Sequence, residues 1–100
     1  MMENFNLAAK IAQLHNQWKT MSKAEIADNI EKYLYEKYPE CQTSFDIKME
    51  KLAEFTGAEK QTIYSWLNRS RERVKMPFHR VCQIAGALEA DIEEILTTKN

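Results

Sequence analysis

The chain reads MEKLAEFTGAEKQTIYSWLN at residues 49–68, and this stretch decides the fold that we expect. Apolar residues recur at helical spacing on both sides of Gly57, which predicts two short helices joined by a tight turn. Glycine suits such a turn because it adopts a left-handed backbone conformation without steric cost. Ala53 is small enough for a second helix to cross close to the first. The residues expected to pack between the two helices are Leu52, Phe55, Ile63, Trp66 and Leu67. The stretch therefore predicts a helix-turn-helix.

Outside this stretch, helical spacing and helix-end signals predict an all-α fold. Ser22 and Glu25 form a capping box, in which each side chain accepts a hydrogen bond from the backbone of the other. Pro39 ends the helix that follows, and residues 40–44 are expected to form a loop. Pro77 fits the first position of a helix, where its missing N–H costs nothing. We expect helices at 4–18, 23–38, 46–55, 59–68, 77–88 and 91–97.

Composition limits the class of protein. A chain of 100 residues with 44% hydrophobic and 29% charged residues suits one small globular domain and an accessory helix. We assign residues 1–21 to the accessory segment and 22–100 to the domain. No apolar run is long enough to cross a membrane, and the N-terminal residues do not resemble a secretory signal. We therefore expect a cytoplasmic protein in which Cys41 and Cys82 are free thiols.

Positive charge is concentrated in one segment, although the net charge of the chain is −1. The segments 22–59 and 83–100 are both acidic. Residues 60–82 carry six cations against Glu72 alone, namely Lys60, Arg69, Arg71, Arg73, Lys75 and Arg80. A basic segment of this kind, next to a short helix, is typical of nucleic-acid binding. The alternative is a solvated loop without a partner.

The stretch at 49–68 resembles the helix-turn-helix of the Cro/phage-repressor (Xre-like) family of transcription regulators. The resemblance continues through the basic loop, Pro77, the run 84–88 and residues 92–96, and so covers about residues 22–97. The motif residues at the family's spacing are Leu52, Ala53, Gly57, Thr62, Ile63, Trp66, Leu67 and Asn68. It implies a five-helix, lambda-repressor-like helix-turn-helix domain, to which the helix at 4–18 is an addition.

The chain departs from the family pattern at three places. Met49 stands where the family often has a glutamine that holds a phosphate. The connection between the helix at 23–38 and the motif is longer than usual. Glu89 occupies a position where the family usually has a glycine that ends a helix.

The resemblance implies a sequence-specific regulator of transcription, expected to be a repressor, that reads the major groove of double-stranded DNA with the helix at 59–68. The side chains implied to face base edges are Lys60, Gln61, Thr62, Tyr64 and Ser65. Gln61 can pair with adenine and Lys60 can donate to guanine, while Tyr64 would reach a phosphate or a thymine methyl group. The side chains implied to follow the phosphate backbone are Lys48, Asn68, Arg69, Arg71, Arg73 and Lys75.

A second function is compatible with the sequence. The same helices would serve as a protein-interaction module without DNA, as in antitoxin-like or phage inhibitor proteins, and would then present an exposed apolar patch. We expect no enzyme, because neither His15 nor His79 has an evident orienting carboxylate and no Gly-rich phosphate loop is present. His79 and Cys82 lie one helical turn apart. Cys41 or His15 would have to complete a metal site there, but no CxxC pair accompanies them, so we expect no metal or other cofactor.

The accessory helix carries an apolar stripe that has two interpretations. Leu7, Ile11, Leu14 and Trp18 follow one another at about one helical turn, and Phe5 adjoins them. The stripe would mediate a homodimer on a palindromic DNA site, because a single module buries little surface on DNA. Alternatively, the helix would fold back and extend the core.

Overall fold

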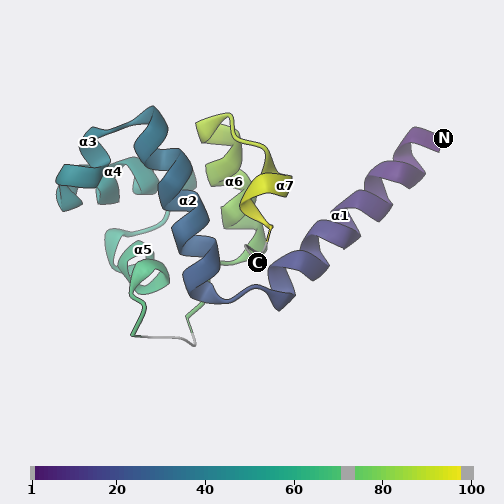
Figure 1. The fold of residues 1–100 in the computed structure, drawn as a ribbon, viewed down its shortest axis with the longest axis horizontal. Coiled ribbons are helices and arrows are strands. Elements are labelled where there is room, and N and C mark those ends of the chain that lie inside the picture. The colour runs from purple at the N-terminus through teal and green to yellow at the C-terminus, as the bar shows by residue number, and fades with distance from the viewer. Residues whose placement is uncertain (1, 71–73, 98–100) are drawn as a thin grey trace.

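The computed structural model describes residues 2–70 and 74–97, with side chains from Asn6 onward. These residues form α-helices and contain no strand, which confirms the all-α class. The helices are α1 (Met2–Thr20), α2 (Lys23–Lys37), α3 (Glu40–Thr43), α4 (Phe45–Thr56), α5 (Lys60–Leu67), α6 (Phe78–Leu88) and α7 (Ile92–Ile95). Helices α2 to α7 pack together, and α1 projects away from them, so the molecule measures 45 × 27 × 26 Å (Figure 1).

One hydrophobic core joins α2, α4, α5, α6 and α7. Its most buried large side chains come from all five helices and are Ile26, Ile30, Leu34, Leu52, Ile63, Val81, Ile84 and Ile95. Each such side chain contributes about 1.5–3 kcal/mol relative to an exposed one. Trp66 is also buried and belongs to this core. The expected burial of Leu52, Ile63, Trp66 and Leu67 is therefore confirmed.

The ends of three helices show how local sequence positions them. Ser22 and Glu25 form the expected capping box before α2. Ser44 accepts a hydrogen bond from the Ile47 N–H and begins α4. Gly57 ends α4 in the left-handed conformation, with φ = 74°, and its N–H donates to the Ala53 carbonyl at 2.7 Å. Glu89 ends α6 in the same conformation, with φ = 54°, although it carries a side chain.

Several expected boundaries were wrong. Helix α1 is longer than the expected 4–18, and α5 covers Lys60–Leu67 rather than 59–68. Residues 40–43 form the one-turn helix α3 rather than a loop, because Pro39 starts a turn that brings Cys41 into the core. Pro77 lies just before α6, in an extended conformation, rather than at its first helical position. Helix α7 ends at Ile95, so the expected helix at 91–97 is shorter at both ends.

The inner half of α1 is attached to the domain. The Trp18 indole N–H donates to the Met76 carbonyl at 2.7 Å. The Lys75 ammonium group donates to the Trp18 and Lys19 carbonyls at the end of α1, and lies 4.5 Å from the centre of a Trp18 ring. Phe78 packs against Trp18 with ring centroids 6.4 Å apart. The apolar stripe therefore extends the core at its inner end.

The outer half of α1 lies beyond the domain. Leu7 and Ile11 are 59% and 48% exposed, and they continue the line of Leu14 and Trp18. An ion pair between Lys10 and Glu93 connects this half to α7. Phe5, the first residue of the expected stripe, lies outside the side chains that the structure describes. Within the described ranges no helix, α1 included, is both long and apolar enough to span a membrane.

The two left-handed helix ends predict opposite effects of substitution. Gly57→Ala should lower the free energy of unfolding by about 1–2 kcal/mol, since a Cβ is strained in this conformation. Glu89→Gly should raise it by about 0.5–1 kcal/mol, because relief of that strain exceeds the added entropy of the unfolded chain. Urea denaturation midpoints measure both effects.

Gly86 provides the matched control for these two variants. It lies inside α6 with no atom near an added Cβ, so Gly86→Ala should stabilise the protein by about 0.5–1 kcal/mol. A loss of stability in Gly86→Ala as large as that in Gly57→Ala would contradict the conformational explanation.

Candidate nucleic-acid interface

Helix α5 has one buried and one exposed side. Ile63, Trp66 and Leu67 turn into the core. The Ser65 carbonyl accepts a hydrogen bond from Lys23 of α2, so α5 is also tied to the domain through its backbone. The exposed side carries most of the residues expected to read bases, namely Lys60, Gln61, Thr62 and Tyr64. Ser65 is only partly exposed, and its hydroxyl donates to the Gln61 carbonyl at 3.0 Å.

Lys60 has a weakly held partner. Its ammonium nitrogen lies 3.8 Å from a carboxylate oxygen of Glu50 on α4, and both side chains are largely exposed. Exposed pairs of this kind contribute about 0–1 kcal/mol. Lys60 can therefore exchange Glu50 for another acceptor at little cost.

Lys48 is held inside the protein. Its side chain is 11% exposed, and its ammonium group donates to the Glu31 carboxylate and to the Tyr35 hydroxyl, the latter at 2.7 Å. Met49, beside it, is buried in the core. The phosphate contact that the resemblance implies at this end of α4 would thus require Lys48 to leave Glu31.

Arg69 is shared between α2 and the end of α5. Its guanidinium group donates to Asp28 at 2.5 Å, to Glu31 at 2.7 Å and to the Leu67 carbonyl at 2.7 Å. Burial raises the pKa of Glu31, but the hydrogen bonds from Arg69 and Lys48 outweigh it and hold this pKa below its ordinary value of 4.5. Glu31 therefore connects α2 to α4 and to the segment after α5.

The remaining cations of the basic segment also contact the protein where the structure describes them. Lys75 is bound to the end of α1, and burial lowers its pKa. Arg80 donates to the Thr56 carbonyl at the end of α4. Asn68 uses its side-chain oxygen to accept hydrogen bonds from Ser70. Arg71 and Arg73, which were expected to follow the phosphate backbone, lie outside the described residues.

An exposed aromatic pair, which the sequence alone did not reveal, lies on the same face. Phe45 of α4 and Tyr64 of α5 are 55% and 50% exposed. Their ring centroids are 5.9 Å apart and the rings are nearly perpendicular, at 76°. Helical spacing alone does not identify Phe45 as a site residue, because it does not show that Phe45 is exposed at the first turn of α4.

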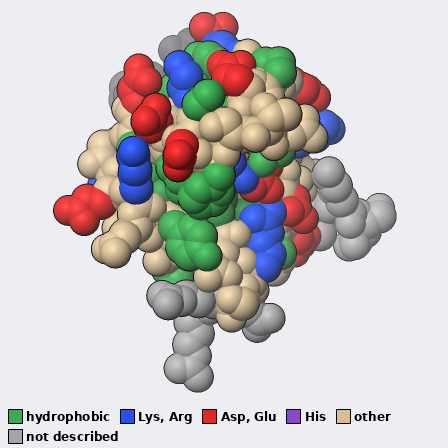
Figure 2. Space-filling model, turned by 90° about the vertical axis from the view of Figure 1, so that its left-hand side faces the viewer, with side chains coloured by type: hydrophobic (Ala, Val, Ile, Leu, Met, Phe, Trp, Pro, Cys, Tyr) green, Lys and Arg blue, Asp and Glu red, His purple; other side chains and the backbone are tan. Residues whose placement is uncertain are grey.

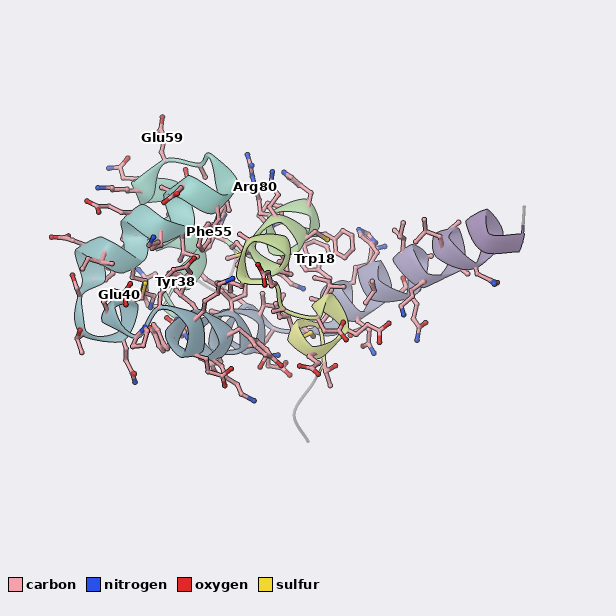
Figure 3. The ribbon with its side chains drawn as sticks, turned by 90° about the horizontal axis from the view of Figure 1, so that it is seen from above. Trp18, Tyr38, Glu40, Phe55, Glu59 and Arg80 are labelled. Carbon is pink, nitrogen blue, oxygen red and sulfur yellow. The ribbon has the colours of Figure 1, made fainter. Side chains whose placement is uncertain are left out.

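Charges of both signs surround hydrophobic side chains on this face. Figure 2 shows hydrophobic side chains in the middle of the surface formed by α3, α4 and α5, with acidic and basic side chains beside them. The Lys60–Glu50 ion pair joins α5 to α4, and the Arg69–Asp28 pair joins the end of α5 to α2. Glu59, which precedes α5, points outward (Figure 3). The described portion of the face is therefore close to neutral rather than strongly positive.

Neither cysteine forms a disulfide in the structure. Cys41 is buried and Cys82 exposed, and burial raises the pKa of both thiols. In the portion of the chain that the structure describes, no three His, Cys, Asp or Glu side chains lie close enough to hold a metal ion.

A scan against protein-family models, a search of curated proteins and a search of solved structures each found no match.

The Glu31 ion pairs predict a pH-dependent stability. Because the pKa of Glu31 is lower in the folded protein, its pairing stabilises the fold above about pH 4.5 and is lost as the pH falls through the lowered pKa. Glu31→Gln should reduce the free energy of unfolding by about 1–3 kcal/mol at pH 7, with a smaller difference below pH 4. Urea denaturation between pH 3 and pH 7 measures this difference.

Glu36→Gln is the control, because it removes an exposed carboxylate from the same helix. It should change stability by less than about 0.5 kcal/mol at pH 7. An equal loss in the two variants would show that Glu31 has no special role.

Proposed function

We propose that the chain is a sequence-specific regulator that binds double-stranded DNA, with α4, Gly57 and α5 as its helix-turn-helix. One observation carries the proposal. Helix α5 follows a left-handed glycine turn, packs one side into the core and leaves Lys60 and Gln61 exposed on its first turn. That is the arrangement in which a recognition helix enters the major groove with its N-terminal residues against base edges.

The base contacts follow from the chemistry of these two side chains. Gln61 offers an amide that pairs in two hydrogen bonds with adenine, and Lys60 offers donors to the acceptors of guanine. Lys60 would exchange its exposed contact with Glu50 for a base. We propose that the chain acts as a repressor.

The backbone contacts are distributed unequally among the basic residues. Lys48, Arg69 and Lys75 are hydrogen-bonded to carboxylates or to helix-terminal carbonyls. Phosphate binding therefore falls mainly to Arg71 and Arg73, which follow α5 in the sequence. Because each neutralised phosphate releases counterions, a small number of contacts gives a shallow dependence of affinity on salt.

We further propose that the outer half of α1 pairs with the same segment of a second copy. Leu7 and Ile11 present an apolar strip beyond the domain, and the described charge nearby, Lys10, is already paired with Glu93 of its own chain. Two-fold pairing would present one recognition helix to each half of a palindromic site, whose half-sites lie about one DNA turn apart.

A second function is favoured by the Phe45–Tyr64 pair. Aromatic side chains surrounded by a polar rim are typical of the centre of a protein–protein interface. The near neutrality of the described face also suits a protein partner. In this alternative the same helices act as a protein-interaction module, and DNA binding is weak and insensitive to sequence.

Neutralising the two arginines tests the DNA-binding proposal. In the Arg71→Ala/Arg73→Ala variant, affinity should fall for all sequences, and the negative slope of log K against log salt should become shallower by about 2. Binding isotherms at four salt concentrations, on a duplex selected from a random pool, measure both changes.

Two variants provide the comparison. Lys32→Ala/Lys37→Ala removes the same charge from α2 and should leave the salt slope unchanged. Gln61→Ala should alter the preferred base, with about 1–3 kcal/mol lost per base contact, and keep the slope. An unchanged slope in the double arginine variant would refute the backbone role.

The dimer has a separate test in the full-length chain. Ile11→Lys places a charge on the apolar strip and should convert a dimer into a monomer in sedimentation equilibrium. Asn16→Lys adds the same charge on the opposite side of α1 and should leave the dimer intact. A wild-type protein that is monomeric at 100 times the concentration used for DNA binding would exclude the pairing of α1.

A further inference from the structure

The Phe45–Tyr64 pair adjoins the residues that are proposed to read bases. Tyr64 follows Lys60 and Gln61 by four and three residues, so the three side chains share one face of α5. Phe45 reaches this face from the first turn of α4. The exposed surface is thus polar at the start of α5 and becomes apolar after the first helical turn.

The geometry of the pair restrains the Tyr64 ring. Phe45 contacts it in a nearly perpendicular arrangement, which is a preferred geometry for aromatic rings. Phe45 is in turn positioned by α4, whose first residue it is, directly after the Ser44 cap. A half-exposed ring held in this way offers a preorganised apolar surface rather than a freely rotating side chain.

We propose that the Phe45–Tyr64 pair contacts the 5-methyl group of a thymine in the major groove, and that Phe45 is a specificity-determining residue outside the recognition helix. This inference rests on the proposed function. Thymine is the one base of ordinary DNA that presents an apolar group in the major groove, and aromatic side chains recognise that group by contact.

The chemistry of the pair favours a methyl group over a phosphate as its partner. Both side chains are half-exposed aromatic rings, and Asp46, which adjoins Phe45 in the first turn of α4, adds no positive charge that would hold a phosphate. The ring surface, rather than the Tyr64 hydroxyl, is then the group that binds.

Replacement of thymine by deoxyuridine tests the inference, since it removes only the methyl group. A duplex is first selected from a random pool with the full-length protein at fixed salt, and each thymine is then replaced singly. At one or more positions, wild-type affinity should fall about 5- to 10-fold. The same position, occupied by 5-methylcytosine opposite guanine, should bind more tightly than unmethylated cytosine.

Protein variants connect this effect to the pair. In Phe45→Ala the thymine-to-uridine difference should shrink to less than about 2-fold, whereas Tyr64→Phe, which keeps the ring, should retain it. Gln61→Ala should lose base preference elsewhere and keep the difference. If Phe45→Ala does not fold, as judged by circular dichroism, Phe45→Leu replaces it and should show a reduced difference.

The outcomes separate this inference from the function on which it rests. A selected duplex bound equally well with thymine or uridine at every position overturns the methyl contact and leaves DNA recognition standing. Failure to select any sequence overturns the proposed function itself. A Phe45→Ala variant that changes the sedimentation of the protein but not its affinity for DNA also overturns the inference and assigns the pair to a protein contact.

Discussion

The C-terminal end of each helix leaves backbone carbonyls without partners, and a chain of short helices contains many such ends. In this protein, cationic side chains satisfy several of them. Lys75 donates to carbonyls at the end of α1, Arg80 to that of Thr56 in α4, and Arg69 to that of Leu67 in α5. A positive charge is also favourable there because the C-terminus of a helix carries partial negative charge. The arrangement of the helices depends on these contacts as well as on the core.

These internal contacts reduce the positive charge that the basic segment can offer to a ligand. Residues 60–82 form a strongly basic segment when charges are counted along the chain, yet the described members of that segment are engaged with carboxylates or carbonyls. Glu31 adds to the effect, because it draws Lys48 and Arg69 toward α2. Charge available to a ligand is therefore smaller than charge present in the sequence. In the proposed DNA complex, hydrogen bonds and apolar contacts would therefore matter relatively more than attraction to phosphate.

Local signals in the sequence predicted much of the fold. The capping box at Ser22, the left-handed turn at Gly57 and the buried side of α5 depend on neighbours within one or two helical turns, so they can be inferred from spacing. The one-turn helix α3 was missed because four residues are too few to show a period. Glu89 adopts a left-handed conformation without being glycine, and no local rule requires it.

The candidate site was less predictable, because its character depends on contacts between distant segments. The exposed polar residues of α5 followed from helical geometry alone. The pairing of Glu31 with Lys48 and Arg69, and that of Phe45 with Tyr64, joins helices whose relative positions the sequence pattern does not specify. Resemblance to a family suggested roles for Lys48 and Lys75, but it could not show that the fold already uses them.

The projecting half of α1 has a consequence for how the molecule is ordered. Leu7 and Ile11 on its outer turns are exposed, although Lys10 is ion-paired with Glu93 of α7. A short helical segment without packing is only marginally stable in water. Amide hydrogens there would exchange with solvent through local opening, at a free energy well below that of global unfolding. A partner that covers Leu7 and Ile11 would suppress this opening. These turns would therefore become more ordered when a partner binds, and slower hydrogen exchange of their amides would report that association.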